Sequence, residues 1–309
     1  MDKKTERLVN VARMYYEQDR TQSEIADRYG ISRPMVSKLL KEARDRGIVT
    51  IRINAPKGES GGTPSLMELV GRCFGIYDGV AVPDGPNDQT TNEAVAEAAI
   101  SYLSELGGAS LGIGWGHIIG DVVKHMEQKA KLVPIGTFVC PLIGNGGVGL
   151  KNYHSNELVR SIAEHSGAQP RFIYSPACVL SEQELKLTRE LDSYHEIYHV
   201  WEKLDVALVN IGNFPSVPDF ASEARYGDLL IRQKAVGRIL NYFMDSQGHI
   251  IRSDTDYAIQ IPLELLTRTR HVVGICSANT SPKAFRAALK TGYLKHFIAP
   301  EHVVREALE

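Results

Sequence analysis

The chain has 309 residues, of which 43% are hydrophobic and 23% charged, as is usual for a globular protein with room for one small and one medium-sized domain. Residues 1–53 hold 12 Lys and Arg against 8 Asp and Glu, whereas residues 54–309 hold 23 against 29, so the net charge of −2 conceals a basic N-terminal part. No run of about 18 apolar residues occurs and the first residues are charged, so we expect a cytoplasmic protein without a membrane span or secretory signal. The basic part favours nucleic acid as a partner.

Three short helices are predicted at the N-terminus. The first carries an apolar stripe at helical spacing, and the second begins after Thr21, where Glu24 completes the pattern of a capping box. Gly30 can take the left-handed conformation that ends this second helix, and Ser32 can cap the third. Pro34 then falls in the first turn, where its missing N–H group costs nothing. A helix, a glycine turn and a helix at this spacing predict a helix-turn-helix.

The third helix separates a buried face from a basic one. In a helix-turn-helix this helix lies in the major groove of DNA. Arg33 can contact guanine with two hydrogen bonds, and Ser37 can bind a base edge or a phosphate. The lysines of the same face suit phosphates. The predicted DNA-binding residues are Thr21, Gln22, Ser32, Arg33, Pro34, Ser37, Lys38, Lys41 and Arg44.

The segment after the third helix predicts a wing and a linker. Residues 48–53, IVTIRI, alternate as a short strand, and residues 54–64 are rich in Gly, Pro and Ser. We therefore expect a winged helix-turn-helix DNA-binding domain over residues 1–53. An effector-binding and oligomerisation domain is expected over residues 65–309. A three-helix protein-interaction module is the alternative interpretation of the first domain.

The larger domain alternates apolar strands with helical patterns, which predicts an α/β, Rossmann-like fold with a doubly wound, mostly parallel sheet. In such sheets ligands bind beyond the carboxyl ends of the strands. The predicted strands are residues 79–82, 110–115, 137–143, 171–174, 205–211, 271–276 and 296–299. The predicted helices begin near residue 65 and continue with residues 92–106, 117–129, 155–166, 182–200, 222–226, 262–268 and 282–290.

Two of the predicted strand ends are rich in glycine. Residues 112–116, GIGWG, run into a helix, so backbone N–H groups at its N-terminus can form an anion site. Residues 144–149, GNGGVG, match the dinucleotide pattern GxGxxG. The following helix begins too late, however, and no acidic residue follows about 20 residues on, so we reject a dinucleotide site. Tight turns without a ligand are the alternative for both loops.

Three further patterns are interpreted as structural. Residues 195–199, HEIYH, match the zinc-protease pattern HExxH, but no third histidine follows at the expected spacing, so a surface helix is preferred. The four scattered cysteines are interpreted as buried thiols, and we expect no cofactor and no metal. Asp245, Asp254 and Asp256 are interpreted as turn residues.

The chain resembles the SorC family of bacterial sugar-responsive transcriptional regulators over nearly its whole length. The resemblance rests on residues 15–53, on GIGWG, and on HSNELVRSIAEHSGA, IYSPA, LDVALVNIG, KAVG and NYFMDSQGHII in the family's order. It implies a sensor domain similar to sugar-phosphate isomerases and deaminases, a dimer or homotetramer, and two partners, double-stranded operator DNA and a sugar-like effector. The effector-binding residues that the resemblance implies are Gly114, Trp115, Gly116, His117, Gly144, Asn145, Gly146, Asn156, Asp245 and Lys283.

Three positions depart from the family pattern. Ile118 stands where the family commonly has Thr, and Arg238 stands where an acidic residue usually follows AVG. Ser281 occupies the position of a Lys near the C-terminus, with Lys283 two residues later. These changes favour a neutral sugar, a polyol or a sugar acid over a phosphorylated effector.

The function predicted from the sequence is regulation of a carbohydrate uptake or catabolism operon under the control of a sugar, polyol or sugar phosphate. The alternative is an isomerase- or deaminase-like enzyme with a DNA-binding appendage. Such an enzyme needs an acid and a base within reach of a carbonyl substrate. Near the glycine loops the sequence offers only His117 and His154, so we expect a protein that is not an enzyme.

Overall fold

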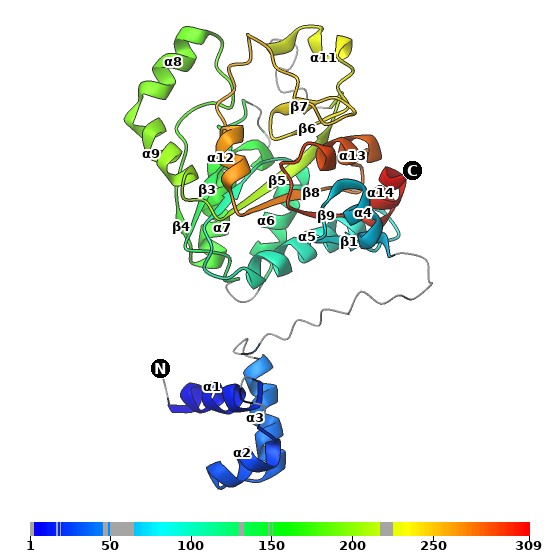
Figure 1. Ribbon diagram of the computed structural model, residues 1–309. Coiled ribbons are helices and arrows are strands. Elements are labelled where there is room, and N and C mark those ends of the chain that lie inside the picture. Colours follow the sequence, from blue (N-terminus) through cyan, green and yellow to red (C-terminus); the bar gives the residue numbers. More distant parts are fainter. Residues whose placement is uncertain are drawn as a thin grey trace. The chain divides into compact units, whose positions relative to one another are not determined.

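The computed structural model divides into two compact units, residues 1–62 and 63–309, each with its own apolar core (Figure 1). Among the described residues no helix has the length and apolar character that a membrane span needs. The structure describes residues 3–16, 18, 20–45, 49, 65–129, 133–147, 149, 151–216 and 225–309.

The described part of the first unit consists of α1 (Lys3–Tyr16), α2 (Gln22–Tyr29) and α3 (Arg33–Asp45). The predicted capping box is present, because Thr21 Oγ1 accepts from the Glu24 N–H at 3.2 Å and Glu24 Oε2 accepts from the Thr21 N–H at 2.8 Å. Gly30 ends α2 in the left-handed region at φ 61° and ψ 37°. The helices close on a core that includes Leu8, Val11, Ile25, Val36 and Leu40.

The region between the units is where the predicted wing and linker fall. The wing over residues 48–53 lies outside the described residues, except for Val49, whose N–H donates to the carbonyl of Ala43 at 3.2 Å. The linker over residues 54–64 also lies outside them. The wing and the domain boundaries therefore stay predictions.

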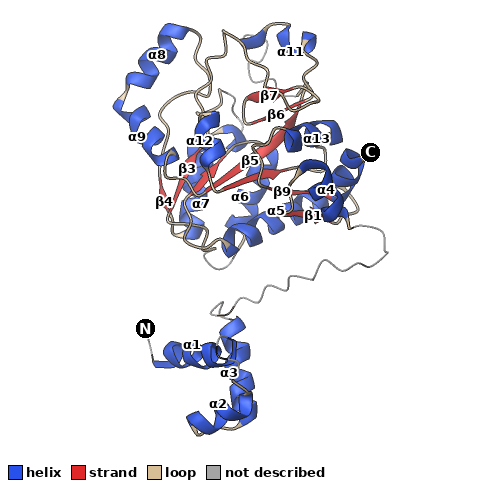
Figure 2. Ribbon diagram, in the orientation of Figure 1, coloured by secondary structure: helices blue, strands red, loops and turns tan. Residues whose placement is uncertain are grey.

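The second unit is built on one twisted sheet in the order β1-β9-β8-β5-β2-β3-β4, in which all neighbours are parallel (Figure 2). Gly112 of β2 pairs with Cys140 on one side and Ala207 on the other. A short antiparallel hairpin, β6 and β7, extends from the end of β5. The strands are β1 (Gly79–Val82), β2 (Leu111–Ile113), β3 (Phe138–Pro141), β4 (Gln169–Pro170), β5 (Val206–Asn213), β6 (Gly237–Ile239), β7 (Tyr242–Met244), β8 (His271–Ile275) and β9 (His296–Pro300).

Helices cover both faces of this sheet. Helices α5, α6 and α7 lie side by side on one face, and α13 and α14 pack together on the other (Figure 1). The helices are α4 (Leu66–Phe74), α5 (Asp88–Glu105), α6 (His117–Glu127), η1 (Lys151–Tyr153), α7 (Ser155–Ser166), α8 (Glu182–Glu190), α9 (Asp192–Trp201), α11 (Leu229–Arg232), α12 (Leu263–Arg268), α13 (Pro282–Lys290) and α14 (Glu301–Leu308). The predicted doubly wound α/β fold is confirmed.

Two predicted elements are wrong in detail. The strand predicted over residues 171–174 is absent, and β4 ends at Pro170, because the Asn156 side chain takes both backbone groups of Ile173. The helix predicted over residues 182–200 is interrupted at Leu191, whose backbone is extended at ψ 139°. In the helix predicted over residues 222–226, only the last two residues are described, and they are helical.

The cysteines differ from the prediction at one position. All four are free thiols; Cys140 and Cys276 are buried, and Cys178 is half-buried. Cys73, however, is exposed on α4. The interpretation of all four as buried thiols is therefore wrong for Cys73, because the apolar face of this short helix is formed by other residues.

Sheet order creates a switch point between β2 and β5. The chain leaves β2 toward β3 on one side, whereas it leaves β5 toward β8 on the other. A crevice forms beyond the carboxyl ends of two such strands, and ligands of open α/β sheets bind there. The GIGWG loop follows β2 and therefore lies at this point.

Candidate functional site

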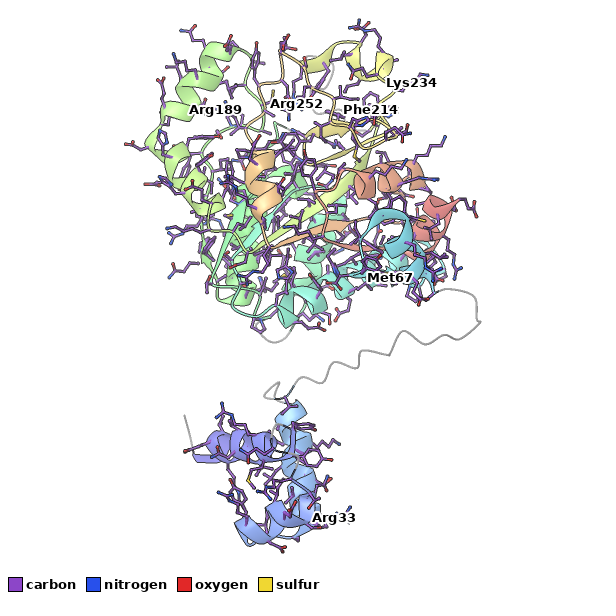
Figure 3. All side chains as sticks on the ribbon, viewed as in Figure 1. Arg33, Met67, Arg189, Phe214, Lys234 and Arg252 are labelled. Carbon is purple, nitrogen blue, oxygen red and sulfur yellow. The ribbon has the colours of Figure 1, made fainter. Side chains whose placement is uncertain are left out.

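The exposed face of α3 carries most of the side chains assigned to DNA. Arg33, Ser37, Lys38 and Lys41 are all exposed, and Arg33 extends from the first turn of the helix (Figure 3). Val36 on the other side is fully buried in the core. A helix with its buried and charged sides separated in this way can lie in a major groove with the charged side toward the bases.

The start of α3 has Pro34 where the sequence predicts it, and the cap by the Ser32 side chain stays a prediction. Pro34 lies in the first turn, and the carbonyl oxygen of Ser32 accepts from the Val36 N–H at 3.2 Å. Met35, which the sequence did not single out, is 46% exposed. The side chain of Arg44 lies outside the described residues.

A cavity of 550 Å³ opens beside the start of α2. Hydroxyl groups, guanidinium groups and a helix N-terminus together suit a phosphate of the DNA backbone. Arg20 makes an exposed ion pair with Glu24 at 3.4 Å, which is too weak to prevent such a contact. Four of the lining residues were not predicted from the sequence, although Arg20 directly precedes the capping residue. The cavity is lined by Tyr15, Tyr16, Arg20, Thr21, Gln22, Ser23 and Arg33.

The glycine loop after β2 joins the sheet to α6. The Gly114 N–H donates to the carbonyl of Leu208 at 2.8 Å, and the Gly116 N–H donates to that of Asn152 at 2.9 Å. Gly116 has φ 116°, which L side chains rarely adopt, and no described side chain caps α6. The first N–H groups of α6 and the helix dipole therefore favour an acceptor or an anion at this loop.

Asn210 of β5 lies against this loop, and it was not among the residues predicted from the sequence. A Cβ atom added to Gly116 would lie 3.2 Å from Asn210 Nδ2, and one added to Gly114 would lie 3.5 Å from Oδ1. The side chain is 9% exposed, and Oδ1 accepts no hydrogen bond from the described residues. An unpaired buried acceptor costs about 1–3 kcal/mol, so Oδ1 is suited to a ligand hydroxyl. The available signal was a polar residue within the apolar strand VALVNIGN.

The loop after β3 is held in place by side-chain hydrogen bonds. Ser155 Oγ donates to the carbonyl of Gly144 at 3.0 Å, and Asn145 Oδ1 accepts from the Asn156 N–H at 3.3 Å. Both ends of the Asn156 amide bind the backbone of Ile173, at 2.9 and 3.0 Å. Asn145 and Asn156 thus shape the loop, and their direct contact with an effector stays a prediction.

Trp115 connects the two glycine loops. Its side chain is 1% exposed, meets Tyr153 edge to face at 5.8 Å, and lies 2.9 Å from a Cβ atom added to Gly146. An effector would therefore meet Trp115 through its backbone. His117 is exposed at the first position of α6 and also contacts the Tyr153 ring, at 5.6 Å. The structure thus brings together residues 114–117 and Gly146, as expected from the resemblance.

Asp245 and Lys283 lie on other loops. Asp245 Oδ1 accepts from the N–H groups of Gln247 at 2.8 Å and His249 at 3.0 Å, in the turn after β7. Lys283 is exposed in the first turn of α13. No hydrogen bond among the described residues joins either side chain to the glycine loops. Their contact with an effector stays a prediction.

Arg238 of β6 brings a buried positive charge to the same region. Its side chain is 6% exposed, Nε lies 3.0 Å from a Cβ atom added to Gly212, and Nη1 donates to Asn241 Oδ1 at 3.0 Å. Burial raises the pKa of Tyr153, and the charge of Arg238 opposes that rise. A guanidinium group here suits a ligand with an acidic group.

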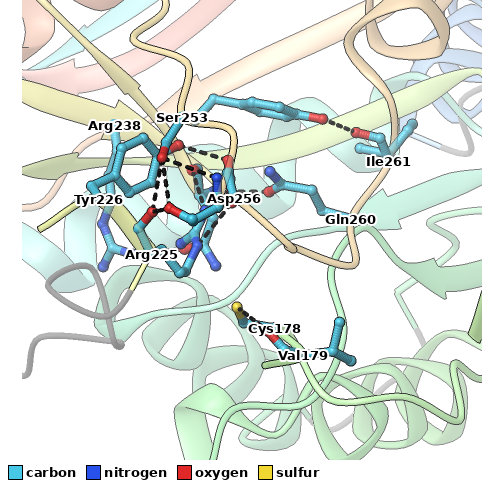
Figure 4. Close-up of polar contacts among 12 residues, drawn as sticks. Cys178, Val179, Arg225, Tyr226, Arg238, Ser253, Asp256, Gln260 and Ile261 are labelled. Atoms are coloured by element: carbon cyan, nitrogen blue, oxygen red, sulfur yellow. Dashed lines mark hydrogen bonds and ion pairs between the residues drawn. The ribbon is translucent and has the colours of Figure 1, made fainter. Parts of the chain in front are cut away.

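A second buried arginine lies beside Arg238 (Figure 4). Arg225, 2% exposed, donates through Nε to Asp256 Oδ1 at 2.8 Å, and Tyr226 donates to Asp256 Oδ2 at 2.6 Å. Burial raises the pKa of Tyr226, and the charge of Asp256 raises it further. The interpretation of Asp256 as a turn residue is incomplete. Its N–H does close a turn onto Ser253 at 3.1 Å, but its carboxylate neutralises a buried guanidinium group.

Comparisons with known proteins show the family to which the chain belongs. Residues 62–309 match the family model of a sugar-binding domain, Sugar-bind, and residues 5–46 match region 4 of sigma-70. The sorbitol operon regulator of Klebsiella pneumoniae is 30% identical over 93% of this chain and 92% of that protein. The chain belongs to the SorC family of transcriptional regulators.

Two further comparisons cover nearly the whole chain. The deoxyribonucleoside regulator of Bacillus subtilis is 26% identical over 99% of this chain and 98% of its own length. The crystal structure of the full-length Klebsiella regulator has a TM-score of 0.68 at 27% identity, over 98% of both chains. The prediction of a sugar-responsive, DNA-binding regulator is thereby confirmed. These relatives are transcriptional regulators, which weighs against the enzyme alternative.

The HExxH pattern lies on α9 of this SorC-family protein. His195 and Glu196 are exposed, and His199 Nδ1 lies 2.8 Å from Glu202 Oε2. No group of three or more His, Cys, Asp or Glu side chains that could hold a metal occurs among the described residues.

His302 of α14 forms hydrogen bonds with the segments that follow β1 and β8, near the carboxyl ends of these strands. Its Nδ1 contacts Asp84 Oδ1, its Nε2 lies 3.2 Å from the carbonyl oxygen of Ala278, and its N–H donates to Asp84 Oδ2 at 3.0 Å. Burial alone would lower the pKa of His302. The hydrogen bond and charge of Asp84, together with the Ala278 carbonyl, outweigh burial and raise it. The protonated imidazole therefore supports the loop between β8 and α13.

Replacing His302 with asparagine should destabilise the protein most at mildly acidic pH. Because the pKa of His302 is higher in the folded chain, its contribution to stability is fully present below about pH 6.5 and is lost as pH rises through the folded-state pKa. Urea unfolding from about pH 6 to 9 should therefore give a difference from wild type that shrinks with rising pH. A constant difference would contradict this assignment. His195→Asn, on exposed α9, is the control and should match wild type.

Proposed function

We propose that this SorC-family regulator controls a carbohydrate uptake or catabolism operon in the cytoplasm, acts as a homo-oligomer, and binds a sugar-like effector at the switch point between β2 and β5. Each subunit offers one recognition helix, and pairing of subunits sets two helices at the spacing of operator half-sites. The effector changes operator affinity because it binds one arrangement of the subunits more tightly than another.

The observation that carries the effector site is the buried Oδ1 of Asn210. It accepts no hydrogen bond from the described residues and lies against the loop that begins α6. A ligand hydroxyl can donate to this oxygen. The N-terminus of α6, together with the positive charge of Arg238 on β6, favours an electronegative or acidic group on the same ligand. Sugar acids and sugar phosphates carry both features, whereas sugars and polyols carry the first.

Replacing Asn210 with leucine should weaken effector binding about 10- to 100-fold, because the effector hydroxyl loses its acceptor at nearly constant side-chain volume. The effector is first identified by melting the wild-type protein with sugars, polyols, sugar acids and their phosphates. At 100 times its dissociation constant, a ligand of the native state adds about 2.7 kcal/mol. His195→Asn, which changes an exposed side chain of α9, should bind like wild type.

The possible results of these binding experiments test the effector class, the position of the site and the absence of catalysis separately. If no compound raises the melting temperature of the folded protein, the effector class is wrong. If Asn210→Leu binds the best compound as tightly as wild type, the site lies elsewhere. Turnover of any sugar phosphate in the same mixtures would favour the enzyme alternative, because the proposed regulator only binds its ligand.

A further inference from the structure

Helix α8 carries exposed leucines on a helix that buries none of its own residues (Figure 1). Leu180, just before the helix, is 88% exposed, Leu187 is 57% exposed and Leu191 is 51% exposed. Leu187 and Leu191 are four residues apart and share one side of α8, and Leu180 is exposed just ahead of the extended N-cap, Ser181. Soluble proteins seldom leave large apolar side chains grouped in this way without a partner.

The stripe faces away from the rest of the domain. Leu185, two residues before Leu187, is half-buried and packs against the main core, and a helix turns about 200° over two residues. Arg189 likewise lines a cavity of 370 Å³ together with Arg252, on the inner side of α8 (Figure 3). The leucine stripe is therefore the outer surface of α8. Helices shorter than about 12–15 residues are marginal in water, so this nine-residue helix gains from cover on that side.

We propose that the α8 stripe, Leu187 and Leu191, binds the same stripe of a second copy of the chain about a twofold axis, with the two helices antiparallel. An antiparallel pair places Leu187 of one copy against Leu191 of the other, so the stripe is complementary to itself. In this arrangement, the residues along one edge of the stripe face the same residues of the other copy, which run in the opposite direction. Exposed Lys186 of one copy comes near exposed Glu190 of the other, and the pair occurs twice.

A second copy fits the stripe better than an unrelated protein does. The apolar side chains lie in the middle with opposite charges beside them, as in the centre and rim of a protein interface. The proposal also rests on the self-association proposed above, which two recognition helices on one operator require. A stable interface buries about 1,200–2,000 Å², so the leucines form the apolar centre of a larger contact.

The first test is the oligomeric state of the full chain by sedimentation equilibrium. Leu187→Glu should raise the dissociation constant about 100-fold, because it buries two carboxylates, one from each copy, between helices that otherwise meet through leucine. Ile231→Glu is the matched control: Ile231 is 73% exposed on α11, away from the stripe, and its replacement should leave the association unchanged. Thermal melts should show both variants folded, since both side chains are exposed.

The second test addresses the antiparallel arrangement and does not depend on Leu187→Glu folding. Lys186→Glu should weaken association about tenfold at low salt, because it sets like charges against each other twice, and Lys186→Glu with Glu190→Lys should restore it. A double variant as weak as the single one would overturn the arrangement. An oligomer that Leu187→Glu leaves intact would overturn the surface and leave the proposed regulator standing. A wild-type monomer at micromolar concentration would overturn both the surface and the proposed self-association.

Discussion

Replacing Arg33 with alanine should reduce the preference of the protein for its operator over unrelated DNA by about 1–3 kcal/mol, which is roughly 5- to 150-fold. Arg33 is exposed in the first turn of α3, where a side chain of a recognition helix reaches base edges (Figure 3). A guanidinium group that binds guanine with two hydrogen bonds discriminates one base, so its loss lowers specific affinity more than non-specific affinity. Titrations of operator and scrambled duplexes at one salt concentration measure this ratio.

Lys41→Ala provides the matched comparison on the same helix. Lys41 is exposed two turns further along, where it suits a phosphate. Its loss should weaken binding to both duplexes alike and reduce the slope of log affinity against log salt by about 1. If Arg33→Ala instead behaved as Lys41→Ala does, Arg33 would be a phosphate contact and base reading would fall to other residues of α3.

Replacing Asp256 with alanine should lower the free energy of unfolding by about 3–5 kcal/mol, as expected when one partner of a buried ion pair is removed. Arg225 is 2% exposed, and the Asp256 carboxylate binds both it and the Tyr226 hydroxyl (Figure 4). The variant leaves a buried guanidinium group without its countercharge. For a domain of this size the melting temperature should fall by roughly 6–20 °C, as scanning calorimetry would measure.

Asp254→Ala is the control for this substitution, two residues away in the same loop. Asp254 is exposed, so its loss should change stability by no more than about 0.5 kcal/mol. If Asp256→Ala melted as wild type does, the Arg225 charge would be compensated in another way. An equal and large loss for both would point to the loop backbone, since Ser253 and Thr255 also bind the carbonyl of Arg225.

The helix-turn-helix could be predicted because its signals are local. Thr21 and Glu24 cap α2, Gly30 ends it, and Pro34 begins α3, and each acts within a few residues of its own position. The alternation of apolar strands with helices likewise predicted the doubly wound sheet. Both inferences need only the period of the pattern and the preferences of single residues.

Competition from distant side chains could not be predicted in the same way. Residues 171–174 have the composition of a strand, yet Asn156 of α7 takes the backbone groups of Ile173 and ends the pairing at Pro170. The strand pattern is unchanged by this contact, because the competing amide comes from another element. Only the packing of α7 against the end of the sheet decides which partner the backbone has.

By itself, the sequence determined the two kinds of domain, the recognition helix and the glycine loop that begins α6. Only the tertiary structure decided that β5 lies beside β2, which brings Asn210 to the loop at residues 114–116. It also decided that Leu187 faces outward while Leu185 faces the core. The physical reason is common to both cases: strand order and the direction of a helix face depend on contacts between residues far apart in the chain, which no local pattern encodes.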